Sequence, residues 1–268
     1  MSESPVRTDV LITVMTYPHP SRGHQELVCT AGLTRSGEWV RLYPIDYRYR
    51  PRDQQFQKYQ WISVGLHPHG AGNDRRKESR KPELETIRVL GDPLPTSRDW
   101  AARRALIDPL PHHSVNELRS LYDADGTSLG IVRPTRILDL KIEDANREWK
   151  PEWATLFQQM RLFGEPQKPL AKIPYKFSYV FECSDSINAH NAMCEDWELG
   201  VLYLREVDRL GSEEKAAESV RKKFLNELCA PDRDTRFFMG TVFPYNTWVV
   251  LGVFWPPKLP EPGQLPLL

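Results

Sequence analysis

The N-terminal part of the chain is patterned as a series of short strands. Residues 9–16 read DVLITVMT and carry apolar side chains on both alternating faces, which predicts a strand that is covered on both sides. Three more strands are predicted at 25–33, 38–43 and 61–66, and the TRSG turn between two of them ends in glycine, as a short hairpin loop favours. Strands of this length in so short a segment are typical of a small β-barrel of the OB or SH3-like kind.

The middle of the chain mixes strands and helices. A strand is predicted at 85–90 and a helix at 97–107. A second helix is predicted from Ser114, because Ser114 and Glu117 form the sequence signature of a capping box. Strands at 128–132 and 136–142 are expected to extend or close the first sheet.

The later part has a different pattern. Residues 173–183 alternate between aromatic and polar side chains, which indicates an antiparallel strand with one face in the core. Two helices are predicted at 194–210 and 212–228, and a hairpin at 236–254. This part is therefore expected to be an antiparallel sheet of at least three strands with two helices on one face.

The predicted fold class is α+β, with an N-terminal small β-barrel followed by an α+β domain. The barrel-like domain with its two short helices is assigned to residues 1–145, and the α+β domain to residues 146–255. Residues 256–268 read as a proline-rich tail.

Charge argues against a global attraction to nucleic acid or membrane. The net charge is +0 at pH 7, but residues 1–110 contain 17 Lys and Arg against 13 Asp and Glu, and the rest contains 19 against 23. The basic first part can still bind phosphates locally. The four cysteines form no CxxC pair, and no apolar run is long enough to cross a bilayer, so a cytoplasmic protein without a membrane partner is expected.

The strand at 38–43 carries the main functional hypothesis. Val40 and Leu42 alternate with Trp39, Arg41 and Tyr43. In one interpretation the aromatic residues are core and Arg41 has a buried partner. In the other they form an exposed stacking platform beside the basic, aromatic segment at 46–60.

Aromatic residues interleaved with cations suit single-stranded or unpaired DNA or RNA, because rings stack on bases and cations contact phosphates. The alternative is a solvated loop whose aromatics pack back onto the barrel. The predicted nucleic-acid-binding residues are Trp39, Arg41, Tyr43, Tyr47, Arg48, Tyr49, Arg50, Arg52, Lys58, Tyr59, Arg75, Arg76 and Lys77. The later domain is then an effector or dimerisation module, and a homodimer or a protein partner stays open.

A second hypothesis is a metal-dependent nuclease or hydrolase that uses His190, Asp196 and Glu198. Two acids and a histidine near a helix start could hold Mg²⁺ and activate a water, although acids there also complement the helix dipole. Cys183, His190 and Cys194 could supply three zinc ligands, against the commoner reading of buried thiols. Apart from these, no cofactor is predicted, and phosphate-loop, dinucleotide, serine-hydrolase and zincin motifs are missing from the sequence.

A third hypothesis is a small-molecule or protein-binding module with a tryptophan-lined pocket. A cleft between the two halves, with the arginines at 48–52 engaged in salt bridges, would favour it over nucleic-acid binding.

The strings VCTAGL, EWVRLYP and CEDWE, the segment 74–79 and FFMGT together resemble an uncharacterised prokaryotic family. The resemblance spans both halves and implies a two-part architecture in a bacterial or archaeal cytoplasm. It implies no activity and no catalytic residues.

Overall fold

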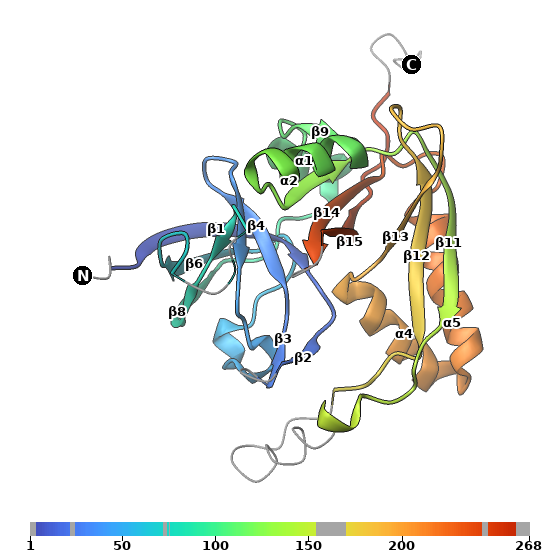
Figure 1. The fold of residues 1–268 in the computed structure, drawn as a ribbon, viewed down its shortest axis with the longest axis horizontal. Coiled ribbons are helices and arrows are strands. Elements are labelled where there is room, and N and C mark those ends of the chain that lie inside the picture. The colour runs from blue at the N-terminus through green and yellow to red at the C-terminus, as the bar shows by residue number, and fades with distance from the viewer. Residues whose placement is uncertain are drawn as a thin grey trace.

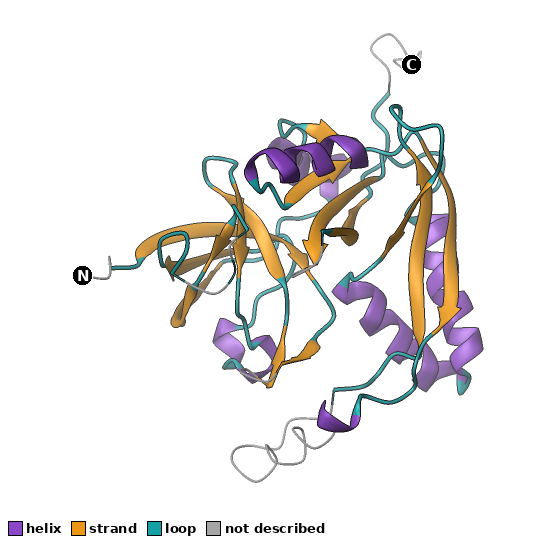
Figure 2. Cartoon of the chain, in the orientation of Figure 1, coloured by secondary structure: helices purple, strands orange, loops and turns teal. Residues whose placement is uncertain are grey.

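The computed structural model describes residues 4–21, 25–71, 74, 76–153, 170–242 and 246–260. In these residues helices and strands are mixed, and the strands form several separate sheets (Figure 2). The predicted α+β class is therefore confirmed. No helix in the described ranges is long and apolar enough to cross a bilayer.

The first sheet has six described strands in the order β7-β5-β4-β1-β6-β8 and curls into half a barrel (Figure 1). Its members are β1 (Val6–Met15), β4 (Thr30–Thr34), β5 (Trp39–Leu42), β6 (Trp61–Leu66), β7 (Ser79–Arg80) and β8 (Pro82–Leu90). The predicted strand at 25–33 is divided in two, because its first residues pair elsewhere. These residues form β3 (Gln25–Leu27), which pairs with β2 (His19–Ser21) in a separate two-stranded sheet. Two 3-10 turns, η1 (Tyr47–Tyr49) and η2 (Arg52–Gln54), precede β6.

Strand β1 is covered on both faces, as its sequence predicts. Val10 and Ile12 belong to one apolar cluster together with Val40 and Val64. The register with β4 shifts between Ile12 and Val14, and Val14 packs into a second cluster shared with later strands. A bulge of this kind bends a strand and re-aims its side chains, so this one strand contributes to two cores.

The second sheet is a central layer. It has the order β15-β14-β10-β9, and its strands are β9 (His112–His113), β10 (Leu129–Val132), β14 (Arg236–Val242) and β15 (Thr247–Phe254). Phe238 and Leu251 pack toward the N-terminal sheet, whereas Phe237 and Val250 join the core on the other side. Figure 1 shows β14 and β15 between the curled sheet and the third sheet.

The third sheet has the order β11-β12-β13 and carries two helices. Its strands are β11 (Arg136–Asp144), β12 (Tyr175–Glu182) and β13 (His190–Met193); the helices are α4 (Trp197–Leu210) and α5 (Glu213–Arg221), the latter continued by a π-helical turn, Lys222–Glu227. The helix boundaries follow the predicted signals: Gly211 ends α4 with a positive φ, and the Ser212 side chain caps α5.

Two further helices lie beside the central sheet (Figure 1). Helix α1 (Ser97–Ile107) buries Trp100 and Ile107 against the second cluster. Helix α2 (Val115–Asp125) begins with the predicted capping box, in which the Ser114 hydroxyl accepts from Glu117 N.

The expected partners of three segments were wrong. The segments at 128–132 and 136–142 are strands, but neither extends the first sheet: β10 pairs with β14, and β11 pairs with β12. The hairpin at 236–254 pairs with β10 and not with β12. Alternation predicts that a segment is a strand, whereas its partner depends on contacts far along the chain. The domain boundary at residue 145 stays a prediction.

Candidate functional site

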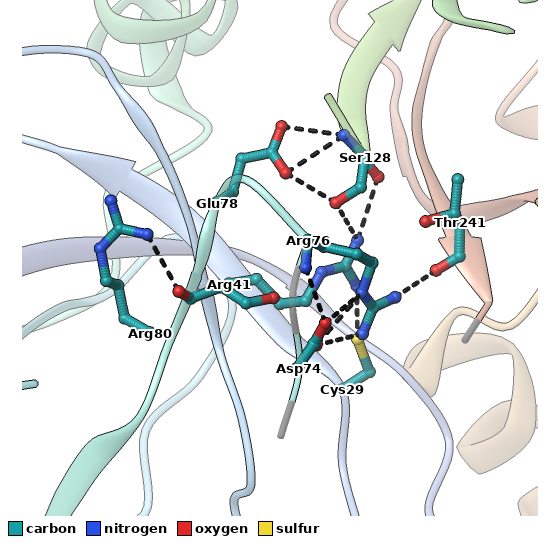
Figure 3. A network of polar contacts seen from close by, with 9 residues as sticks. Cys29, Arg41, Asp74, Arg76, Glu78, Arg80, Ser128 and Thr241 are labelled. Carbon is teal, nitrogen blue, oxygen red and sulfur yellow. Dashed lines mark hydrogen bonds and ion pairs between the residues drawn. The ribbon is translucent and has the colours of Figure 1, made fainter. Parts of the chain in front are cut away.

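Arg41 is fully buried, so the interpretation that exposes it on a platform is wrong. Its guanidinium donates from Nη1 to Cys29 Sγ at 3.0 Å and from Nη2 to Ser128 O at 3.0 Å. Glu78, also buried, accepts from both Ser128 N and Ser128 Oγ (Figure 3). Both faces of β5 are covered, because Val40 packs in the first cluster and the Trp39 ring meets Phe238 edge-on at 5.8 Å. This network joins the first sheet to the central sheet.

The basic loop after β6 is engaged in the same region. Arg76 forms an ion pair with Asp74 and donates to Thr241 O at 2.5 Å (Figure 3). Lys77 pairs with Asp125 and stays half-exposed. Arg75 lies outside the described residues. Arg76 therefore joins this loop to β14, whereas Lys77 forms a surface ion pair with the end of α2.

Two of the three arginines at 48–52 also have carboxylate partners. Arg48 lies 2.9 Å from the buried carboxylate of Glu26, and Arg50 contacts both Asp46 at 2.8 Å and Glu85 at 2.6 Å. Arg52 is exposed. Opposing carboxylates reduce the field that these arginines offer to a phosphate.

The predicted aromatic residues differ in exposure. Tyr59 is buried, and Tyr47 is half-buried and donates its hydroxyl to Phe56 O at 2.6 Å. Tyr43 and Tyr49 are also half-buried. None of the described rings of this set is fully exposed, so the segment packs largely on the protein.

Lys58 is buried between the two acids of the nuclease hypothesis. Its Nζ lies 2.9 Å from Asp196 Oδ2 and 2.9 Å from Glu198 Oε2. Burial opposes the lysine charge, but the two carboxylates more than compensate and raise the pKa of Lys58 above its usual value. The positive charge of Lys58 lowers the pKa of Glu198. Asp196 also caps α4, accepting from Glu198 N at 2.9 Å.

The structure does not bring His190 to Asp196 and Glu198. His190 is paired with Phe181 on β12, whereas Cys194 N donates to Phe177 O. Four strand residues separate these positions, which is roughly 13 Å at about 3.3 Å per residue. Asp196 and Glu198 follow Cys194, at the opposite end of this strand pair from His190. The prediction that these three residues form one catalytic site is therefore wrong.

The three predicted zinc ligands are separated in the same way. Cys183 follows β12 at its Phe181 end and Cys194 lies opposite Phe177, roughly 20 Å apart along the strand. No group of three or more His, Cys, Asp or Glu within the described residues could hold a metal ion. Burial raises the pKa of Cys183 and of Cys194, as expected for inert thiols.

A cavity of about 230 Å³ lies between the segment after β1 and the third sheet with α4. We call it the aromatic pocket. Its side chains come from four separate stretches of the chain, around 17–19, 145–149, 172–177 and 193–200. Its aromatic and charged lining residues are Tyr17, His19, Trp149, Lys172, Tyr175, Lys176, Phe177 and Glu195.

Hydrogen bonds fix two rings of this pocket, those of Tyr17 and Trp149. Tyr17 donates its hydroxyl to Ala171 O at 2.9 Å, and its backbone N donates to Glu195 O at 3.0 Å. Burial raises the pKa of Tyr17 to about 12, so the hydroxyl remains a donor at neutral pH. Trp149 Nε1 donates to Leu170 O at 3.0 Å. These two rings are thus held in place without a ligand.

The pocket also has a charged side. Lys172 Nζ lies 4.8 Å from the centre of the Trp149 ring, and Lys176 is exposed on β12. His19 Nε2 is 2.9 Å from Glu195 Oε2. Desolvation of the imidazole lowers the pKa of His19. The hydrogen bond and the charge of Glu195 raise it by more, so the net shift is upward. Aromatic faces beside lysines can hold a planar ring and contact an attached anion.

A tryptophan-lined pocket was the third hypothesis from the sequence, but the residues of this pocket were not identified there. The strand alternation at 173–183 placed Tyr175 and Phe177 on one face, but no local signal linked them to Tyr17 or Trp149. Such a set is assembled only by the pairing of segments far apart in the chain.

Comparisons with known proteins agree with an uncharacterised family. A family model described as Domain of unknown function (DUF8757) matches residues 111–266, and one described as Domain of unknown function (DUF8758) matches residues 6–109. No curated protein shows significant similarity to the chain.

Solved structures resemble the chain only weakly. A murine DNA binding protein bound with double-stranded DNA has 9% identity and a TM-score of 0.32, over 96% of this chain and 97% of that one. The tetrameric p202 HIN2 has 8% identity and a TM-score of 0.31, over 96% and 97%. A replication protein A heterotrimer bound to single-stranded DNA has 11% identity and a TM-score of 0.25, over 96% and 67%. TM-scores this low do not establish a shared fold.

Proposed function

We propose that this chain, which belongs to the DUF8757 family of domains of unknown function, binds single-stranded or unpaired nucleic acid by holding one unstacked base in the aromatic pocket. The observation that carries the proposal is the convergence of four aromatic rings and two lysines on one cavity. Unpaired bases stack on aromatic side chains, and lysines contact the phosphates that flank them.

The size of the pocket favours a base that belongs to a strand. About 230 Å³ is below the roughly 300–1,000 Å³ of sites that enclose a whole small ligand. A base ring can enter while its sugar and phosphate stay outside, near Lys176.

The electrostatic part of binding is small in this proposal. The chain has no net charge, and Glu195 offsets His19 at the pocket. With Lys172 and Lys176 as the two phosphate contacts, the logarithm of affinity should fall with the logarithm of salt with a slope of about −1.4 for single strands.

The predicted basic-aromatic face contributes less in this proposal than the sequence suggests. Tyr49, which is half-buried, and Arg52, which is exposed, lie in the turns before β6 and are proposed as flanking contacts. The curled first sheet, which forms the half-barrel, is proposed to be of the OB type.

A second candidate is a free small ligand with the same planar chemistry, such as a nucleoside. It is favoured by the salt bridges of Arg48 and Arg50 and by the position of the pocket between separate segments. Both candidates use the same rings, and they differ in whether phosphates contribute.

Fluorescence anisotropy with labelled single-stranded RNA, single-stranded DNA and duplex, at about 50 and 200 mM salt, tests the proposal. Single strands should bind more tightly than duplex, and Trp149→Ala should weaken binding by about 1–3 kcal/mol, the worth of one stacked base. Lys172→Ala with Lys176→Ala should flatten the salt slope, whereas Lys141→Ala, on the exposed side of β11, should leave it unchanged.

The outcomes separate the two candidates. Binding of free nucleosides with no binding of oligonucleotides would replace the first candidate by the second. No binding of either, or equal affinity in Trp149→Ala, would remove the aromatic pocket as the site.

A further inference from the structure

A second cavity, of about 350 Å³, lies on another side of the third sheet and is lined by polar side chains. It is enclosed by the start of α2, the loop before β13, β13 itself, and one residue each from β14 and β15. We call it the polar pocket. The side chains that bear on its chemistry are Asn116, Arg119, Asn188, His190, Asn191 and Trp248.

Two buried nitrogen atoms of this lining have no partner among the described residues. They are His190 Nε2 and Trp248 Nε1. Trp248 is 5% exposed, so its indole N–H is a donor withdrawn from bulk water. A buried donor without a partner destabilises the folded protein, and both nitrogen atoms belong to residues that line one cavity. A ligand that accepts from Trp248 would recover that loss.

The charge of the lining selects the kind of ligand. Arg119 is the single lining residue that is ionised at all ordinary pH values, and the lining contains no Asp or Glu. Desolvation lowers the pKa of His190, the Arg119 charge lowers it further, and the charge of Asp185, in the loop before β13, opposes them; the net shift is downward, so this ring is neutral near pH 7. One fixed positive charge with neutral donors around it matches one oxyanion group.

The amides add recognition of the rest of the ligand. Asn188 and Asn191 are exposed at the cavity, and Asn116 Oδ1 lies 3.4 Å from Arg119 Nη1. Each amide can donate and accept, which suits hydroxyl or amide groups next to an oxyanion. The volume falls within the roughly 300–1,000 Å³ of sites that enclose small organic ligands.

We propose that the polar pocket binds a small organic oxyanion, a phosphate monoester or a carboxylate, through Arg119 and the indole N–H of Trp248, with His190 Nε2 as a neutral hydrogen-bond partner. This site shares no side chain with the aromatic pocket and does not depend on nucleic-acid binding. It also gives His190, which stands apart from Asp196 and Glu198, a role in binding and none in hydrolysis.

Nuclear magnetic resonance of the whole 268-residue chain tests the proposal. The Trp248 indole cross-peak is assigned by its loss in Trp248→Phe, and AMP, inorganic phosphate and succinate are added separately at millimolar concentrations. AMP or succinate should shift this cross-peak, and Arg119→Gln should weaken the response about tenfold or more, because a charge-assisted hydrogen bond is lost. Long-range ¹⁵N spectra should show the His190 Nε2 signal moving with the same dissociation constant.

Two controls keep the result specific. Arg205→Gln removes an exposed arginine on α4 and should leave the Trp248 response unchanged. Trp149→Ala disables the aromatic pocket and should also leave it unchanged, so failure of nucleic-acid binding does not affect this test. No Trp248 shift with AMP or succinate, or an equal shift in Arg119→Gln, overturns the proposal; a response to inorganic phosphate alone would do the same, because it would show an adventitious ion only.

Discussion

Gly200 in α4 leaves the space that the ring of Tyr17 occupies. A Cβ atom at position 200 would lie 2.3 Å from Tyr17 Cδ2, closer than real Cβ contacts allow. Tyr17 follows β1, whereas Gly200 lies in the first part of α4. The missing side chain therefore allows the N-terminal segment to form one wall of the aromatic pocket.

Gly200→Ala is expected to displace Tyr17 and to weaken the binding of single-stranded RNA about tenfold. Alanine also favours the helix by about 1 kcal/mol, so stability should fall less than the steric conflict alone implies. Anisotropy gives the affinity and urea unfolding gives the stability. Arg205→Ala on the same helix is the control, and an unchanged affinity in Gly200→Ala would contradict this role of Tyr17.

Lys58→Met is expected to lower the free energy of unfolding by about 3–5 kcal/mol, because it leaves the Asp196 carboxylate buried without its partner. Urea unfolding at neutral pH measures the change. Adding Asp196→Leu should restore part of the loss, less about 1 kcal/mol for the helix cap that Asp196 supplies. Lys141→Met serves as the exposed control. A Lys58→Met variant as stable as the wild type would show that the ion pair of Lys58 and Asp196 contributes nothing to stability.

Asp74→Asn is expected to destabilise the protein by about 1–3 kcal/mol at neutral pH. Burial raises the pKa of Asp74, but the hydrogen bonds and charge of Arg76 outweigh it, so the folded pKa is below its usual value. A lowered folded pKa contributes stability above about pH 4, and this contribution is lost as the pH falls through the folded pKa.

The difference in stability between wild type and Asp74→Asn should therefore narrow below about pH 4. Unfolding in urea across that range measures it. Asp92→Asn, in an exposed loop, should differ little from wild type throughout. A difference that is constant with pH would mean that the Asp74 charge has no part in stability.

Ser114→Ala is expected to cost about 1 kcal/mol, within the 0.5–2 kcal/mol range of lost helix caps. Ser114 accepts from Glu117 N at 3.0 Å and also contacts Asp185, in the loop that borders the polar pocket. Thermal or urea unfolding checks the cost. Ser120→Ala, later in the same helix and exposed, should have a smaller effect.

Local features of the fold could be predicted because their causes are local. The capping box at Ser114, the glycine that ends α4 and the hairpin turn at Gly37 each depend on residues within a few positions, and each is observed. The alternation at 173–183 likewise places Phe177, Tyr179 and Phe181 in the core, as the sequence indicates.

The candidate sites could not be predicted in this way. The sequence left open whether Arg41 is exposed or has a buried partner, and Lys58 stood in a segment predicted to bind nucleic acid. Their partners are Ser128 and Asp196, and the second pair is 138 positions apart, so no local pattern identified them. Whether a cation binds a ligand or a carboxylate of its own chain depends on which sheets meet. Tyr17 and Trp149 lie in one pocket for the same reason, and neither stands in a motif.

The central sheet has a consequence for how the chain folds. Strand β10 pairs with β14, which is made much later during synthesis, and Arg76 reaches Thr241 across 165 positions. Contacts of such long range close slowly, because a large loop must be ordered before they form. On a ribosome, the newly made curled sheet would display an uncovered apolar face, with Val14 and Leu33 in it, until β14 and β15 emerge. Protection of that face by a chaperone during synthesis is therefore expected to determine the yield of folded protein.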